Sequence, residues 1–141
     1  MAAIILTCVD PRLAHDVIRD QIGRRLEREG LPVRDIYVVS DVGGNLGSGF
    51  TNTLDLLTAA KVPVVLSAIL HHDDCLAARL NVRKPLETTV AEIRTELSRR
   101  GIKCPVLSGN ITTESSGLTW TDQPPVSREV FKFRMPRMMG R

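Results

Sequence analysis

Residues 3–12 read Ala-Ile-Ile-Leu-Thr-Cys-Val-Asp-Pro-Arg, and residues 63–75 read Pro-Val-Val-Leu-Ser-Ala-Ile-Leu-His-His-Asp-Asp-Cys. Each stretch begins with a short run of apolar, often β-branched side chains, which is typical of a strand buried in a sheet. Each run ends in polar side chains, among them cysteine and histidine. The two stretches therefore predict buried strands whose ends carry the chemistry of the protein.

Predicted helices separate the predicted strands along the chain. Asp10 and Pro11 favour a helix start, with Asp10 as the capping residue, and the apolar residues that follow repeat at helical spacing. These apolar residues are Leu13, Val17, Ile18, Ile22 and Leu26. The remaining expected elements are strands at 35–40, 104–111 and 118–121 and helices at 51–60 and from Pro85. The alternation predicts an α/β fold. We expect a doubly wound, mostly parallel sheet in the order of about 2-1-3-4, an antiparallel edge strand, and helices on both faces.

The net charge of +3 is concentrated at the end of the chain. Residues 124–141 hold five basic residues and one acidic residue, a charge of +4, which leaves −1 for residues 1–123. We therefore expect one domain at 1–123 and a basic C-terminal extension at 124–141. A short basic segment beside a slightly acidic domain is a small electrostatic footprint, which disfavours nucleic acid as a partner.

The cysteine pattern and the N-terminal sequence indicate the cellular location of the protein. Cys8, Cys75 and Cys104 have no disulfide-like spacing, and Cys104 is expected to be an ordinary core thiol. The N-terminus lacks the positive region of a signal peptide, and no apolar run approaches the roughly 18 residues of a membrane span. These features predict a cytoplasmic protein with no membrane partner.

Candidate metal ligands end the first and third predicted strands, as Cys8-Val-Asp-Pro-Arg12 and His72-Asp-Asp-Cys75. Strands one and three of a doubly wound sheet are often neighbours at the topological switch point, where ligands bind. Two thiolates and an imidazole suit zinc, and three protein ligands leave the fourth position open. Taken singly, Cys8 fits a core position and a lone His-x-x-Cys is a weak signal, but together they indicate a catalytic zinc site.

The paired motifs Cys-x-Asp-x-Arg and His-x-x-Cys resemble the zinc signature of the β-class carbonic anhydrases. The glycine loop Val42-Gly-Gly-Asn45 and the turns at Ser108-Gly109 and Ser116-Gly117-Leu118 extend the resemblance over about residues 3–122. The resemblance implies a zinc-dependent lyase that reversibly hydrates carbon dioxide to bicarbonate and forms a homodimer or a higher homo-oligomer.

The resemblance also implies roles for individual residues. Zn²⁺ would be held by Cys8, His72 and Cys75 and would activate a water molecule. Asp10 would accept a hydrogen bond from that water, and Arg12 would keep Asp10 ionised and in place. When the pair breaks, Asp10 would move onto the metal and close the site. A role for Asp10 as a helix cap is the alternative, and one carboxylate can serve both roles.

Several positions depart from the family pattern. Asp41 stands where the family has arginine, Leu76 and His71 stand where glycine is usual, and only seven residues precede Cys8. We therefore expect the N-terminal helices common in the family to be missing. These departures keep open a zinc protein without turnover, or an enzyme that acts on another small electrophile such as carbonyl sulfide or carbon disulfide.

Other candidate functions rest on weaker signals. The segment from Gly43 to Gly49 follows a strand and precedes a helix, as phosphate loops do, but its spacing matches no dinucleotide or Walker motif. The loop of a cysteine phosphatase is longer than the interval from Cys8 to Arg12. His71 could be a ligand, a proton shuttle or a packing residue, and His15 a shuttle or a surface residue. Only His72 has the x-x spacing to Cys75.

The C-terminal extension alternates between polar and apolar side chains. Val130, Lys132 and Arg134 would face one way, and Phe131, Phe133 and Met135 the other. An apolar face needs a surface to cover it. We expect residues 128–136 to lie across a neighbouring subunit, as an added strand or a clasp. The alternative is a basic tail with no such contact.

Overall fold

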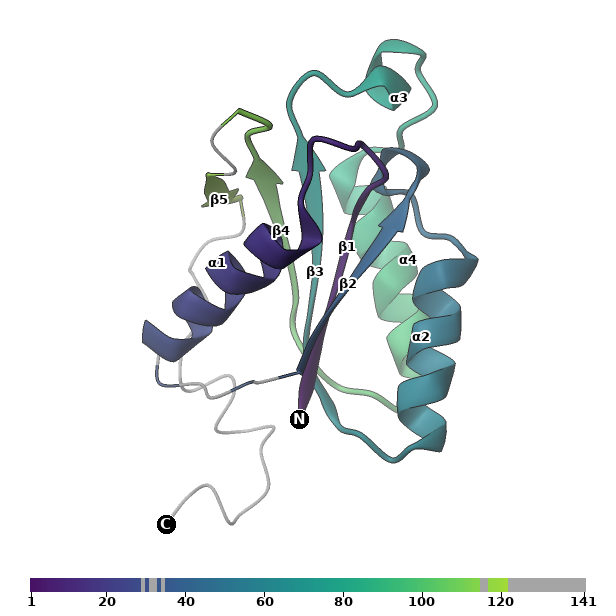
Figure 1. Ribbon diagram of the computed structural model, residues 1–141. Coiled ribbons are helices and arrows are strands. Elements are labelled where there is room, and N and C mark those ends of the chain that lie inside the picture. Colours follow the sequence, from purple (N-terminus) through teal and green to yellow (C-terminus); the bar gives the residue numbers. More distant parts are fainter. Residues whose placement is uncertain (29, 31–32, 34, 115–116, 122–141) are drawn as a thin grey trace.

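A computed structural model describes residues 1–28, 30, 33, 35–114 and 117–121 as one five-stranded sheet with helices on both faces (Figure 1). The strands are β1 (Ala2–Cys8), β2 (Asp35–Asp41), β3 (Val64–His72), β4 (Val106–Ile111) and β5 (Leu118–Trp120). The helical elements are α1 (His15–Arg28), the short 3₁₀ turn η1 (Val42–Gly44), α2 (Ser48–Ala59), α3 (Leu76–Arg79) and α4 (Leu86–Arg99).

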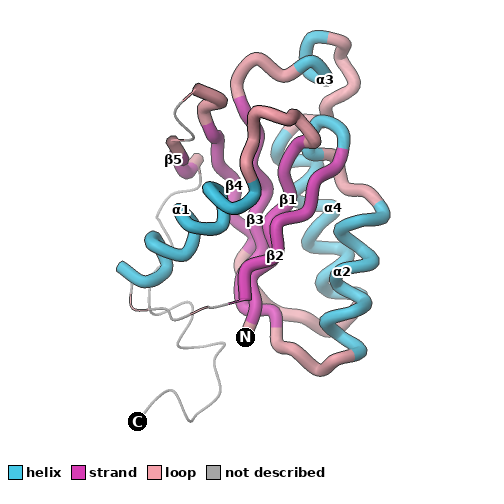
Figure 2. The backbone as a smooth tube through the Cα atoms, viewed as in Figure 1, coloured by secondary structure: helices cyan, strands magenta, loops and turns pink. Residues whose placement is uncertain are grey.

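The strand order is β2-β1-β3-β4-β5, and only the β4–β5 pair is antiparallel. This confirms the predicted doubly wound sheet with an antiparallel edge. The chain runs from β1 out to β2 and then back past β1 to β3, so β1 and β3 lie side by side where the winding reverses (Figure 2). The carboxyl ends of these two strands define the edge at which this fold places ligands.

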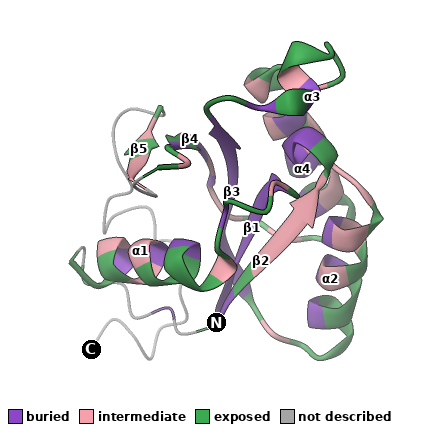
Figure 3. Ribbon diagram, turned by 45° about the horizontal axis from the view of Figure 1, so that its top comes forward, coloured by how far each residue is buried: buried purple, intermediate pink, exposed green. Residues whose placement is uncertain are grey.

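Two apolar layers hold the helices to the sheet. On one face α1 contributes Ile18, Ile22 and Leu26, all at most 1% exposed. On the other face α2 and α4 contribute Phe50, Leu54, Leu57, Ile93 and Leu97. Every residue of β1 and β3 is buried, because both strands are covered on two sides (Figure 3). Near-continuous apolar runs are the expected sequence signature of such strands.

The start of α1 was predicted wrongly. The helix begins at His15 rather than at Pro11, because Asp10 closes a separate turn: its carbonyl accepts the N–H of Leu13 at 3.0 Å and its Oδ1 accepts the N–H of Arg12 at 2.9 Å. Asp10 therefore does not cap α1. Val17, which fits the helical repeat, is 37% exposed, since the buried stripe consists of Ile18, Ile22 and Leu26.

Three further observations complete the fold. The helices of the described residues include none long and apolar enough to cross a membrane. Residues 124–141, expected to form the basic extension, lie outside the described residues, as do residues 128–136 with the expected subunit contact. Cys104 is half-buried, forms no disulfide, and packs against the core between the sheet and α2 and α4.

Candidate metal centre

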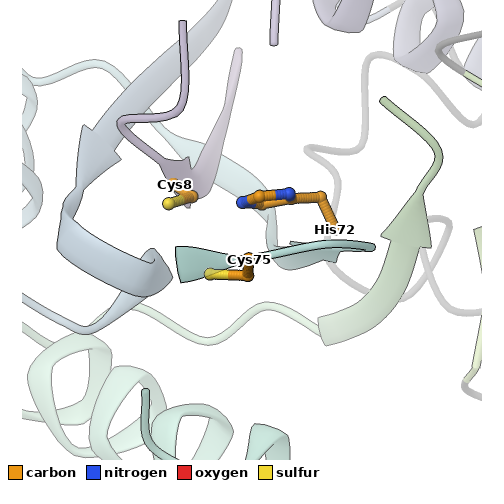
Figure 4. Close-up of side chains that lie close together, drawn as sticks. All are labelled: Cys8, His72 and Cys75. Carbon is orange, nitrogen blue, oxygen red and sulfur yellow. The ribbon is translucent and has the colours of Figure 1, made fainter. Parts of the chain in front are cut away.

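Cys8, His72 and Cys75 converge at the carboxyl edge of the sheet. Cys8 is the last residue of β1, His72 is the last residue of β3, and Cys75 directly precedes α3. Their potential ligand atoms all lie within 4.8 Å of one another, and the residues are only 7%, 3% and 3% exposed (Figure 4). The parallel pairing of β1 with β3 brings together residues more than 60 positions apart in the chain.

The ring of His72 is held with one nitrogen free for a ligand. Nδ1 lies 2.7 Å from the carbonyl oxygen of Asp73, so it carries the proton and donates. Nε2 is therefore the basic nitrogen, and it is buried without a hydrogen-bond partner among the described residues. A backbone carbonyl on one ring nitrogen and an unpartnered second nitrogen is the usual arrangement of a metal-binding histidine.

The donor set fits zinc. Two sulfurs and one nitrogen at tetrahedral Zn²⁺ distances would be separated by about 3.5–3.8 Å, within the spacing seen here. Structural zinc sites have four protein ligands, whereas three ligands leave a position for water or substrate. The described residues offer Cys8, His72 and Cys75 as their group of potential ligands. The arrangement therefore suits a catalytic site.

The carboxylate of Asp10 faces this cluster and is held by Arg12. Nε and Nη2 of Arg12 donate to Oδ1 and Oδ2 of Asp10 at 3.0 and 2.7 Å, a two-pronged ion pair. These hydrogen bonds lower the pKa of Asp10 to about 2, against a smaller opposing effect of burial. Asp10 Oδ2 also lies 3.8 Å from His72 Nε2. An ionised acceptor is thus fixed beside the free histidine nitrogen.

Arg12 has a second partner that the sequence did not single out. Its Nη1 donates to the carboxylate of Asp74 at 3.2 Å, and its Nη2 donates to the backbone oxygen of Asp74 at 3.0 Å. Asp74 has a positive φ of 49° and also lies 3.7 Å from Arg79. Arg12 therefore joins the loop after β1 to the loop that carries Cys75. The one sequence feature that could have pointed to Asp74 is its position between His72 and Cys75 in the His-x-x-Cys motif.

Packing contacts and hydrogen bonds explain the residue types of the glycine loop. Gly43 and Gly44 have φ values of 66° and 70°, and a Cβ on Gly44 would lie 3.3 Å from Ile69 Cδ1. Asn45 accepts the N–H of Lys84 at 2.9 Å and donates to the carbonyl of Val82 at 2.9 Å. These contacts account for the glycines and for Asn45 as a brace on the segment before α4.

The other two histidines lie apart from the ligand cluster. Burial, followed by the charge of Arg83, lowers the pKa of His71 to about 4. Adjacent residues of a strand point to opposite faces, so His71 points away from the side occupied by His72. His15 is half-buried and hydrogen-bonded to Ser40. It is therefore not the surface residue that was one of the two predictions for it.

Comparisons with known proteins place the fold. A scan against protein-family models found no match, and a search of curated proteins also found none. Among solved structures, β-carbonic anhydrase isoform I from Trichomonas vaginalis is 17% identical, with a TM-score of 0.53 over 84% of this chain and 80% of that chain. The Coccomyxa β-carbonic anhydrase is 11% identical, with a TM-score of 0.52 over 90% of this chain and 74% of that one. A tetrameric β-carbonic anhydrase from Sordaria macrospora is 12% identical, with a TM-score of 0.51 over 84% and 79%.

The structure is therefore an α/β domain with a possible metal-binding cluster at the switch point of its sheet. Its fold is that of the β-carbonic anhydrases, and the resemblance inferred from the motifs is confirmed at the level of fold. At these identities the likeness concerns the fold alone.

Proposed function

We propose that the chain is a zinc-dependent, carbonic anhydrase-like lyase that reversibly hydrates carbon dioxide to bicarbonate. The observation that carries the proposal is the buried convergence of Cys8, His72 and Cys75, with the Nε2 atom of His72 unpartnered among the described residues. Two thiolates and one imidazole are a donor set for Zn²⁺. Zinc would supply the Lewis acidity that makes a water molecule nucleophilic at moderate pH.

In this proposal Asp10 and Arg12 are the catalytic pair. The Asp10 carboxylate is ionised and lies beside His72, where it can accept a hydrogen bond from the reacting water and fix its orientation. Arg12 acts through Asp10, since its two donors hold both carboxylate oxygens. If the pair broke, Asp10, whose Oδ2 lies 3.8 Å from His72 Nε2, would be free to ligate the metal and close the site.

Apolar side chains flank the proposed ligands and suit an uncharged substrate. Val9 follows Cys8, Leu76 follows Cys75, and Val42 follows Asp41, the residue paired with Cys8 in the sheet. They are 52%, 59% and 60% exposed. Exposed apolar side chains of this kind are compatible with an uncharged substrate such as carbon dioxide.

The same exposed apolar residues support the proposal of a homodimer or higher homo-oligomer. Leu80 and Val82, 65% and 54% exposed, extend the group beyond Leu76. One solved structure of this fold is described as tetrameric. The proposed assembly includes residues 128–136 as a contact with the neighbouring subunit. The cytoplasmic location and the absence of a nucleic-acid partner stay predictions from the sequence.

A second candidate keeps the metal site but not the hydration of carbon dioxide. Asp41, His71 and Leu76 depart from the family pattern close to the proposed ligands. Burial raises the pKa of Asp41, and its Oδ2 has no hydrogen-bond partner among the described residues. An aspartate at position 41, where the family has arginine, changes the charge beside the site. This change favours a zinc protein that does not hydrate carbon dioxide, or one that acts on carbonyl sulfide or carbon disulfide.

A stopped-flow hydration assay on the zinc-loaded chain separates these candidates. The proposal predicts a rate above the uncatalysed one that requires zinc and falls steeply in Asp10→Ala. Asp16→Ala, which changes an aspartate in the first turn of α1, is the matched control. Zinc-loaded protein with no rate above background would reject carbon dioxide hydration. Turnover of carbonyl sulfide or carbon disulfide by the same sample would support the alternative substrates.

A further inference from the structure

A polar pocket lies at the start of α4, on the other side of β3 from the cluster of Cys8, His72 and Cys75. Its volume is about 450 Å³, and we call it the α4 pocket. The residues that line it and matter below are His71, Arg83, Lys84, Leu86, Glu87 and Asn110. They come from β3, β4, the segment before α4 and the first turn of α4, so several elements build the pocket.

The sheet contributes a buried polar atom without a hydrogen-bond partner to this pocket. His71 and Asn110 are register partners in the parallel pair β3–β4, so their side chains stand next to each other on one face. His71 is only 5% exposed, and its Nε2 has no hydrogen-bond partner among the described residues. Leaving a buried polar group unpaired is unfavourable, so a buried atom without a partner indicates that a partner is missing.

The first turn of α4 supplies two backbone donors. The helix has 14 residues, and its N-cap, Pro85, provides no side-chain hydrogen bond. The N–H groups of Thr88 and Thr89 both bond to the carbonyl of Pro85, at 3.1 and 3.2 Å. Within the described part of the chain, the N–H groups of Leu86 and Glu87 are left without an acceptor. Free N–H groups at a helix N-terminus attract anions.

The charges around the α4 pocket determine the expected affinity. Arg83 donates through Nη1 to the carbonyl of His72 at 3.2 Å, which fixes its guanidinium beside the pocket. Lys84 is paired with Glu92 at 2.8 Å, and the exposed Glu87 adds a negative charge. Arg83 is therefore the main attraction for an anion, and Glu87 opposes it. Binding should be weak to moderate, and it should tighten when the charge of Glu87 is removed.

We propose that the α4 pocket binds the oxyanion group of a small molecule, a carboxylate or a phosphate, between Arg83, Asn110 and the first amides of α4. An oxyanion offers several acceptors, which matches a guanidinium, an amide, two backbone N–H groups and a ring nitrogen. The volume exceeds that of the oxyanion group alone and leaves room for the rest of a small molecule. The site does not depend on the metal or on the proposed hydration of carbon dioxide.

The test is a titration of the zinc-loaded, full-length protein with inorganic phosphate, and separately with acetate, at constant ionic strength. Backbone amide NMR shifts follow the binding. We expect saturable shifts at Leu86, Glu87 and Asn110, apart from any shifts at residues 8–12 and 72–75. Tighter binding of phosphate or of acetate supports the site in either case and identifies the preferred group.

Variants test the assigned donors and the sign of the charge effect. Arg83→Gln and Asn110→Ala should each weaken binding, Arg83→Gln by about tenfold because a charge-assisted contact is lost. Glu87→Gln should tighten binding, an effect that damage to the fold would not produce. Arg94→Gln, an exposed arginine further along α4, is the control and should leave the affinity unchanged. If Arg83→Gln does not fold, Asn110→Ala and Glu87→Gln carry the test.

Three results would overturn the proposal. The first is the absence of saturable shifts with either anion, which would mean that water alone satisfies His71. The second is shifts confined to residues 8–12 and 72–75, which would place the anion at the metal. The third is a Glu87→Gln protein that binds no more tightly than the parent.

Discussion

Replacing Arg12 by lysine should separate the proposed chemistry from the stability of the fold. Arg12 makes two charge-assisted hydrogen bonds to Asp10, at 3.0 and 2.7 Å, and two further contacts to Asp74, at 3.2 and 3.0 Å. Lysine keeps the positive charge, but a single ammonium group cannot reproduce the planar, two-pronged contact. Arg12→Lys therefore leaves Asp10 held mainly by the backbone N–H of residue 12, at 2.9 Å from Oδ1, and releases Asp74.

The structure predicts a small effect of Arg12→Lys on stability and a larger effect on hydration activity. The side chain of Arg12 is 45% exposed, and ion pairs of that exposure contribute little to stability. The free energy of unfolding should therefore change only slightly. Substituting a residue that orients a group beside a metal typically lowers activity by about 10–100-fold. Hydration should drop within that range.

The assay measures hydration and chemical denaturation of Arg12→Lys beside the parent. Arg24→Lys is the matched control, because Arg24 also pairs with an aspartate, Asp20, at 2.7 Å, but on the outer surface of α1. The control should keep the parent's rate and stability. An Arg12→Lys protein with the parent's rate would refute the role assigned to the pair. A loss of several kcal/mol would show that Arg12 serves mainly the fold.

Further predictions concern three other parts of the chain. Burial raises the pKa of Asp41, so the folded state holds its proton to higher pH than the unfolded state, and stability falls as pH rises through that interval. Asp41→Asn should therefore be more stable than the parent at pH 7, with a flatter dependence of the unfolding free energy on pH in urea titrations. A Cβ at Gly109 would lie 2.9 Å from the carbonyl oxygen of Thr119, so Gly109→Ala should lower the unfolding free energy by about 1–3 kcal/mol, and an unchanged value would contradict the packing of β4 on β5. Removing residues 124–141 should lower the mass in solution measured by light scattering, and an unchanged mass would reject the proposed subunit contact.

The sheet could be predicted because its signals are local. β1 and β3 are covered on both faces, so their sequences are largely apolar, and both were predicted as buried strands. The strand order then followed from alternation and from the rules of doubly wound sheets. The meeting of Cys8 with His72 and Cys75 could be predicted as a consequence, because it needs only adjacent strands ending at one edge.

The pairing of Arg12 with Asp10 was predicted from the resemblance, but other side-chain contacts could not be predicted. Asp10 and Pro11 have the residue types of a helix start, yet Asp10 forms a turn with Arg12 and Leu13, and α1 begins four residues after Pro11. Arg12 donates to Asp74, which has a positive φ; aspartate tolerates that conformation, but its residue type alone does not predict where it occurs. The α4 pocket forms where three elements meet and leaves no pattern in the sequence.

X-ray absorption at the zinc edge, on protein purified and loaded with one equivalent of zinc, tests the central claim most directly. The account predicts two sulfur ligands at about 2.3 Å and at least one nitrogen at about 2.0–2.1 Å, the donors of Cys8, Cys75 and His72. Failure to retain zinc, or a shell of oxygen and nitrogen without sulfur, would contradict it.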